Sequence, residues 1–135
     1  MSRLSDIQAF LKSEFPHSKC VIEQVGNASA TVLYPVGLED LRPGGTVSGP
    51  VMMLLADMAL YVAVLGDIGI VPLTVTTSLS INFLRKPAAH TSLRGVCKLL
   101  KVGRSLAVGE VSLYSQGSDQ LLAHATGTYA IPRQR

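Results

Sequence analysis

One acidic side chain stands alone inside the most apolar stretch of the chain. Asp57 is the only charged residue between Val47 and Leu65, in the run VSGPVMMLLADMALYVAVL. An ionised carboxylate in apolar surroundings costs several kcal/mol unless something compensates for it. The acid therefore either takes part directly in the function of the protein or pairs with a hydroxyl or amide elsewhere in the fold.

Two other kinds of chemistry have weaker support. Residues 45–49 read GTVSG, one residue away from the G-x-S-x-G pattern of serine hydrolases, and no strand immediately precedes Ser48. His17, His90 and His124 lie in no triad-like context and lack the spacing of metal ligands. We therefore expect neither a Ser-His-Asp mechanism nor a metal site.

The composition is that of a single, rather apolar domain. The chain has 135 residues, of which 47% are hydrophobic and 16% charged, and a formal net charge of +3. This length suits one domain over residues 1–135, and the apolar excess points to surface hidden between subunits. The basic residues are scattered, with few aromatic residues between them, which argues against nucleic acid. Cys20 and Cys97 have no C-x-x-C or zinc spacing, which favours two reduced, buried thiols.

The apolar stretch raises the question of a membrane span. Its length of about 19 residues is borderline, but Gly49-Pro50 lies near one end and the charge of Asp57 lies at the centre, where it is costly. The N-terminal segment MSRLSDIQAFLKSEF has interspersed charges and no cleavage site of a signal peptide. We expect a cytoplasmic protein that does not enter a membrane.

Local patterns predict two helices and six strands. Ser48 is a suitable N-cap and Pro50 is tolerated in a first helical turn, so the apolar run should be a helix. It is apolar on every face and should be buried all round. The short connections between the last four strands predict an antiparallel meander. The expected elements are a helix at 4–14, strands at 20–25 and 28–36, a loop at 37–46, the apolar helix, and strands at 73–84, 91–102, 105–115 and 121–131. This order predicts an α+β fold in which a long antiparallel sheet wraps one buried helix.

The same order resembles the hotdog fold, and three motifs extend the likeness to PaaI-like acyl-CoA thioesterases. The segment SGPVMMLLAD at 48–57 is similar to the family's H-G-G-x-x-x-x-L-A-D helix. The segment SINFLR at 80–85 resembles its I-x-F-L-R-P strand, and LKVGRS at 100–105 resembles its next hairpin. The likeness spans residues 30–131 approximately, and the helix and strand motifs together are moderately specific.

The resemblance implies roles for particular residues. Asp57 would be the catalytic carboxylate, acting as general base on water or as nucleophile on the thioester carbonyl. The amide of Gly49 would bind the thioester oxygen, which agrees with the partial positive charge of a helix N-terminus. Relatives often use a strand hydroxyl to orient the water or the acid. Alternation places Thr76 and Ser78 on one face of the strand and Thr77 on the other, and we choose Thr77.

The spacing of these two groups predicts a shared site. Gly49 and Asp57 are eight residues apart, which corresponds to roughly 12 Å along a helix. A base and an oxyanion hole must both lie about 3 Å from the reacting centre. Two antiparallel helices from two subunits can meet this demand, so we expect a homodimer or homotetramer with active sites between subunits.

The sequence departs from the family pattern around the helix N-terminus. Ser48 stands where His is usual, and Pro50 replaces the second Gly and removes an N–H donor. Arg42 stands where relatives often place an Asn that holds the thioester carbonyl. Arg42 could act as a donor, bind an anionic group of the substrate, or be a solvated loop residue.

Basic residues at strand ends complete the list of candidate substrate contacts. Arg85, Lys86 and Arg104 could meet the phosphates of coenzyme A, or could be solvated turn charges. No metal or redox cofactor is expected, and coenzyme A enters only as part of the substrate. A hotdog hydratase ranks low because no His accompanies Asp57, whereas a non-catalytic acyl-CoA-binding dimer remains the alternative.

Overall fold

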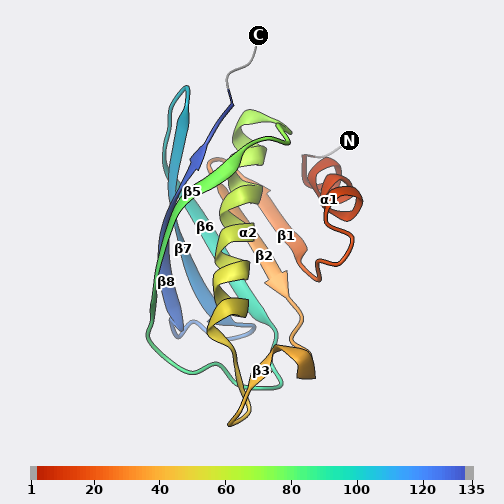
Figure 1. The fold of residues 1–135 in the computed structure, drawn as a ribbon, viewed down its shortest axis with the longest axis vertical. Coiled ribbons are helices and arrows are strands. Elements are labelled where there is room, and N and C mark those ends of the chain that lie inside the picture. The colour runs from red at the N-terminus through yellow and green to blue at the C-terminus, as the bar shows by residue number, and fades with distance from the viewer. Residues whose placement is uncertain (1–2, 133–135) are drawn as a thin grey trace.

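A curved antiparallel sheet wraps one long helix in the computed structural model, which describes residues 3–132 (Figure 1). This arrangement confirms the predicted α+β architecture. The elements are α1 (Arg3–Glu14), β1 (Val21–Gly26), β2 (Ser29–Tyr34), the 3-10 helix η1 (Leu38–Asp40), β3 (Leu41–Arg42), β4 (Thr46–Val47), α2 (Gly49–Ile68), β5 (Val75–Phe83), β6 (Leu93–Val102), β7 (Leu106–Ser115) and β8 (Ala123–Ala130).

The strand order differs from the predicted meander at one strand. The six-stranded sheet runs β1-β2-β6-β7-β8-β5, so β6, β7 and β8 form a meander but β5 pairs with β8 at the far edge. The prediction treated the turn after β5 as a tight hairpin. Residues 84–92 instead form a connection long enough to cross to the other side of the sheet, where β6 pairs with β2. One edge of β5 is therefore without a strand partner in residues 3–132.

Helix α2 packs against the concave face of the sheet at positions where strand residues are small. A Cβ atom on Gly109 or Gly127 would lie 2.7 Å or 2.6 Å from the methyl carbons of Leu60. Glycine at these two positions lets the helix approach the backbones of β7 and β8 closely. Leu55, Leu60 and Leu65 are completely buried, and apolar burial of this kind is the main stabilising contribution to such a fold.

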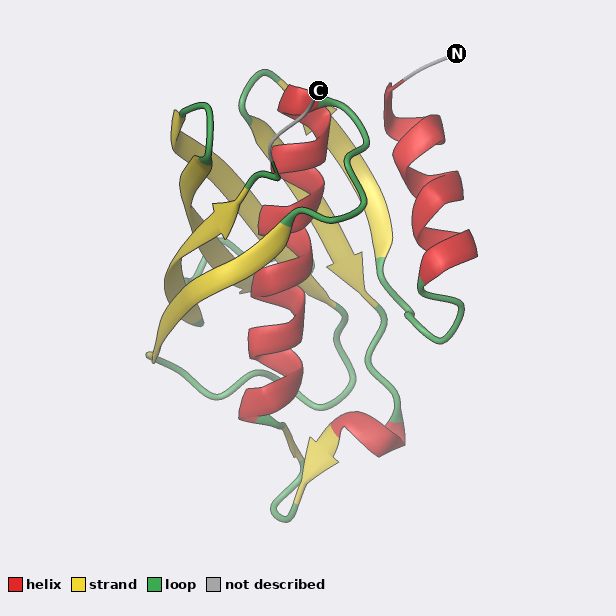
Figure 2. Cartoon of the chain, turned by 45° about the horizontal axis from the view of Figure 1, so that its top comes forward, coloured by secondary structure: helices red, strands yellow, loops and turns green. Residues whose placement is uncertain are grey.

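The prediction that α2 is buried all round was wrong. Met53 is 38% exposed and Leu54 49% exposed, and both belong to the face of the helix turned away from the sheet. The reason is geometric, since one curved sheet covers only part of a helix (Figure 2). By length and mean hydropathy of 1.9 the helix could cross a membrane, but 61% of its most apolar window is buried inside the protein, as expected of a core helix.

Residues 37–46, predicted as a loop, contain η1 and the short hairpin of β3 and β4. The side chain of Asp40 organises this segment, because it accepts hydrogen bonds from Tyr34 Oη at 2.7 Å, Lys19 Nζ at 2.5 Å and Gly37 N at 2.8 Å. The carbonyl of Asp40 also accepts from the amide of Ser48 at 2.9 Å. These hydrogen bonds hold the segment that precedes α2 against the end of β2 and against Lys19.

Candidate active site between the central helix and the edge strand

The carboxylate of Asp57 is held by two hydroxyl groups from the sheet. Thr76 Oγ1 donates to Asp57 Oδ1 at 2.7 Å, and Tyr129 Oη donates to the same oxygen at 2.6 Å. Tyr129 Oη also lies 3.1 Å from the main-chain carbonyl of Asp57. Within residues 3–132 no donor reaches Oδ2 and no Lys, Arg or His forms an ion pair with this acid. Asp57 is thus paired through one oxygen only.

Tyr129 did not appear among the predicted site residues. It is 3% exposed, and its ring stacks on that of Tyr61 with centroids 5.7 Å apart. Burial and then the hydrogen bond to Asp57 raise the pKa of Tyr129, so its hydroxyl stays protonated and acts as a donor. The sequence does contain a signal for this residue. Alternation along β8 turns Ala123, Ala125 and Tyr129 inward, and a buried tyrosine needs a hydrogen-bond partner for its hydroxyl.

The strand hydroxyl beside Asp57 belongs to Thr76 and not to Thr77, which corrects the prediction. Thr77 Oγ1 donates instead to the carbonyl of Thr128 at 3.2 Å. Simple alternation from the inward-packed Leu79 would turn Thr77 inward. A β-bulge between Thr76 and Ser78 breaks this alternation and brings Thr76 to the inner face. Bulges of this kind are not readable from residue types alone.

A cavity of about 420 Å³ opens beside the carboxylate. Its walls are largely apolar or aromatic, with Asp57 and Thr76 among the few polar groups. The lining residues are Phe15, Leu54, Asp57, Met58, Tyr61, Pro72, Thr74, Val75, Thr76 and Tyr129. An apolar cavity with a carboxylate in its wall suits a substrate that has an apolar group next to a polar reacting centre.

The start of α2 retains the predicted capping geometry. Ser48 is the N-cap, and its Oγ accepts a hydrogen bond from Val51 N at 3.4 Å. Gly49 is the first helical residue, and no acceptor for its N–H lies within residues 3–132. Pro50 has no N–H to offer. The ring of Phe83 lies 3.4 Å from the position that a Cβ atom on Gly49 would take, so the free amide lies beside an aromatic ring.

The predicted basic contacts fall at two ends of the molecule. Arg42 is exposed in β3, and Arg85 and Lys86 are exposed directly after β5, at the end of the fold where α2 begins. Arg104 lies in the turn between β6 and β7, at the opposite end in Figure 1. One subunit therefore brings the first three close to the start of α2 but does not bring Arg104 there.

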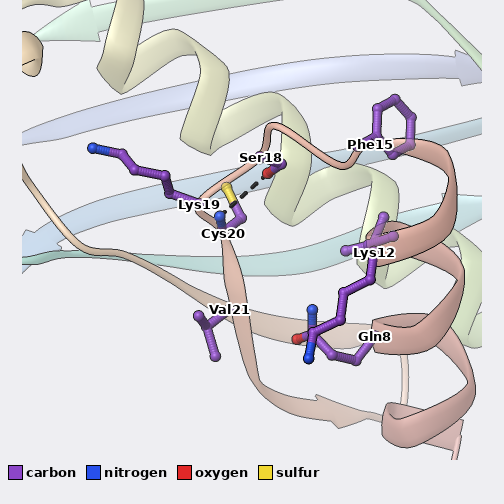
Figure 3. Close-up of a pocket in the computed structure, with 8 residues that line it drawn as sticks. Gln8, Lys12, Phe15, Ser18, Lys19, Cys20 and Val21 are labelled. Carbon is purple, nitrogen blue, oxygen red and sulfur yellow. Dashed lines mark hydrogen bonds between the residues drawn. The ribbon is translucent and has the colours of Figure 1, made fainter.

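A separate pocket lies between α1 and β1 and contains Cys20 and Lys12 (Figure 3). Both cysteines are free and buried. Burial raises the pKa of Cys20, and burial together with Glu110 raises that of Cys97 to about 12, so neither thiol is activated as a nucleophile. Among the described residues no group of three or more His, Cys, Asp or Glu side chains could hold a metal ion.

Comparison with known proteins identifies the family. A family model described as the thioesterase superfamily matches residues 44–122. The chain belongs to the thioesterase superfamily. No protein of curated function matches the chain.

Solved structures agree with this membership. A candidate thioesterase from Silicibacter sp. TM1040 is 41% identical to this thioesterase-family chain, with a TM-score of 0.88 over 96% of this chain and 91% of that one. A mutant of the phenylacetic acid degradation protein PaaI from Thermus thermophilus has 22% identity and a TM-score of 0.75, over 92% and 99% of the two chains. A hypothetical thioesterase from Streptococcus pneumoniae TIGR4, solved with coenzyme A, has 23% identity and a TM-score of 0.75, over 88% and 93%. These likenesses confirm the hotdog fold.

Proposed function

We propose that the protein hydrolyses the thioester bond of a small or medium acyl- or aryl-CoA. The observation that carries this proposal is the position of Asp57, whose Oδ1 is held by two hydroxyls while Oδ2 lacks a donor within residues 3–132, in the wall of an apolar cavity. Membership of the thioesterase superfamily and the coenzyme A bound to the Streptococcus protein support it. The cavity would hold the acyl group.

The hydrolytic step needs one base and one oxyanion donor. Acting as general base, Asp57 takes a proton from water while the water oxygen bonds to the thioester carbon. The carbonyl oxygen then carries the negative charge and accepts a hydrogen bond from a helix N-terminal amide. When the C–S bond breaks, the departing thiolate takes the proton from Asp57 and the acid product leaves. Acting as nucleophile, the carboxylate would attack the thioester carbon, the C–S bond would break and the thiolate would leave. Water would then hydrolyse the mixed anhydride to the acid product and restore the Asp57 carboxylate.

The amide that completes this site would be Gly49 of a partner subunit. The two groups lie roughly 12 Å apart along α2, which is too far for one substrate carbonyl. The face of α2 that carries Met53 and Leu54 is exposed, and the free edge of β5 carries exposed apolar side chains such as Val75 and Phe83. Apolar residues on an unpaired strand edge are suited to burial against a second copy, as a homodimer or as part of a homotetramer.

The basic residues would hold the coenzyme A moiety. Arg85 and Lys86 follow β5 at the end where α2 begins, so they can meet phosphates of a thioester lying at Gly49. Arg42 in the β3–β4 hairpin can donate to the thioester carbonyl or to an anionic group. Arg104 lies at the opposite end of the subunit, so it would contact a bound coenzyme A only from a neighbouring subunit. The reaction as proposed uses no metal or redox cofactor.

Release of free thiol from a panel of acyl-CoAs tests this function. The wild type should cleave at least one member, whereas Asp57→Asn should retain the fold and lose the activity. Equal rates for the two proteins would refute the catalytic role of Asp57. If no thioester is cleaved but acyl-CoA binds saturably, the protein is a non-catalytic acyl-CoA-binding dimer. The absence of an N–H at Pro50 and the use of Ser48 as a cap favour that alternative.

The shared site has its own test, in which two inactive variants are combined. Gly49→Pro removes the amide hydrogen at a first helical position, where proline is favoured. The extended backbone of Ser48, at φ −71° and ψ 152°, is compatible with a following proline. Mixed dimers of Gly49→Pro and Asp57→Asn contain one intact site only if the site is shared, so random mixing should restore about a quarter of the wild-type activity. No recovery, or a fully active monomer, would refute sharing, and Gly49→Ala is the control that keeps the N–H.

A further inference from the structure

Two neighbouring strands direct their hydroxyls at a single carboxylate oxygen. Thr76 on β5 and Tyr129 on β8 are partners in the strand register, and both donate to Oδ1 of Asp57. The bulge in β5 is what places Thr76 on the same face as Tyr129. A carboxylate oxygen that accepts two short hydrogen bonds is fixed in position, and the plane of the carboxylate is fixed with it.

We propose that Tyr129 is a positioning residue for the reaction, which with Thr76 holds Oδ1 so that Oδ2 is the oxygen that reacts. This inference rests on the proposed thioesterase function. In the general-base route Oδ2 takes the proton from water and returns it to the leaving thiolate, while Oδ1 keeps its two hydrogen bonds throughout. In the nucleophilic route the same oxygen forms the bond to the acyl carbon.

The ring of Tyr129 is held firmly enough for this task. It is nearly fully buried and stacks on Tyr61, which in turn makes an edge contact with Phe15 at 6.1 Å between centroids. The Tyr129 hydroxyl has one proton, and the 2.6 Å contact with Oδ1 is shorter than the 3.1 Å contact with the carbonyl of Asp57. The proton therefore points to the carboxylate, in an orientation that exists before substrate binds.

The charged groups around Asp57 are few, so the hydroxyls of Thr76 and Tyr129 are its main local partners. Of the cavity-lining residues only Asp57, Tyr61 and Tyr129 can titrate, and one further acid, Glu14 of α1, acts on Tyr61. No ion pair with a basic side chain supports the negative charge of Asp57 within residues 3–132. Within the described residues two neutral hydroxyls are then the groups that hold this carboxylate in place, so the loss of one should be visible in kcat.

The test is Tyr129→Phe, which keeps the ring and removes the donor. We expect kcat to fall about tenfold or more with little change in KM, as for the loss of a hydrogen bond to a charged group. Tyr114→Phe is the matched control, since Tyr114 lies beside Arg94 at 4.8 Å from its ring and outside the active site, and it should change neither quantity.

A second measurement does not depend on turnover. In protein labelled with ¹³C at aspartate carboxyls, the Asp57 signal is identified by its loss in Asp57→Asn. Its chemical shift at one fixed pH should change in Tyr129→Phe, because the hydrogen bond to Oδ1 is lost, and should stay in place in Tyr114→Phe. An unchanged Asp57 signal in Tyr129→Phe would overturn the proposal, even if kcat fell together with the melting temperature. An inactive wild type whose Asp57 signal still shifts would instead refute the thioesterase function and leave the positioning by Tyr129 standing.

Discussion

Two carboxylates within residues 3–132 each accept a short hydrogen bond from a tyrosine, and their remaining surroundings differ. Tyr34 donates to Asp40 at 2.7 Å, and Tyr129 donates to Asp57 at 2.6 Å. Asp40 is 4% exposed and its second oxygen accepts from Lys19 and from the amide of Gly37. Asp57 borders an open cavity, and within residues 3–132 its second oxygen has no donor.

The difference suits Asp40 to a structural role and Asp57 to the reactive role proposed above. Burial raises the pKa of Asp40, but the hydrogen bonds from Gly37, Lys19 and Tyr34 outweigh it and hold the pKa below its ordinary value. Burial and the same hydrogen bond raise the pKa of Tyr34 to about 12. Every donor in this cluster stabilises the charge in place. Asp57 is positioned by donors on one side and left open on the other, as a base or nucleophile must be.

The most direct test of the different roles of Asp40 and Asp57 is the same substitution at both acids. Asp57→Asn should lower kcat by about 10³-fold, in the range expected for loss of a general base, and should change the melting temperature little. Asp40→Asn should leave kcat within about twofold, because the Asp40 side chain bonds to Tyr34, Lys19 and Gly37 and its main-chain bond to Ser48 is kept. Thiol-release kinetics and thermal unfolding of both variants measure this. Comparable losses of kcat in the two would refute the division of roles.

The free energy of unfolding should fall more in Asp40→Asn than in Asp57→Asn, which is the reverse of the order expected for kcat. Asp40→Asn should lower the free energy of unfolding by about 2 kcal/mol, because a buried carboxylate in a partly buried ion pair loses its charge while its donors stay in place. Denaturant unfolding measures the change. Glu39→Gln is the matched control, since Glu39 binds the same lysine at 2.7 Å but is exposed, and its loss should be much smaller.

Low pH should weaken the hydrogen bonds between Asp40 and its partners over a defined pH range. A folded-state pKa below the ordinary value of 3.8 means that Asp40 contributes its stability fully above that pH. This contribution is lost as the pH falls through 3.8 toward the folded-state pKa. Melting temperatures between pH 6 and pH 3 should therefore converge for the wild type and Asp40→Asn. Parallel curves would show that another group dominates acid unfolding.

The smallest expected effect comes from Tyr34→Phe, the structural counterpart of Tyr129→Phe. It should cost about 1 kcal/mol of stability through one lost hydrogen bond, and should leave kcat unchanged. If Tyr34→Phe lowered kcat as much as Tyr129→Phe, the two tyrosines would not differ in function. Steady-state kinetics, alongside the unfolding free energies, decide between these outcomes.

The sequence alone predicted the parts of the fold that depend on neighbouring residues. Both helices and all six strands of the main sheet follow from apolar periodicity and turn residues, and Ser48 caps α2 as expected. The place of β5 in the sheet was not predictable, because strand order depends on pairing between distant segments. The short β3–β4 hairpin was missed for a similar reason, since tertiary contacts to Asp40 organise residues 37–48.

The residues of the candidate site also fall into those that the sequence predicted and those that only the tertiary structure revealed. Asp57 stands out in the sequence because one charge in an apolar helix is visible within a single segment, and Gly49 follows from the helix N-terminus. Only the tertiary structure decided which groups hold Asp57. Thr76 replaces Thr77 because a bulge shifts the strand, and Tyr129 reaches the carboxylate across 72 residues of chain. Hydrogen bonds between distant side chains depend on how the backbone segments meet in space, and residue types in one segment do not encode that.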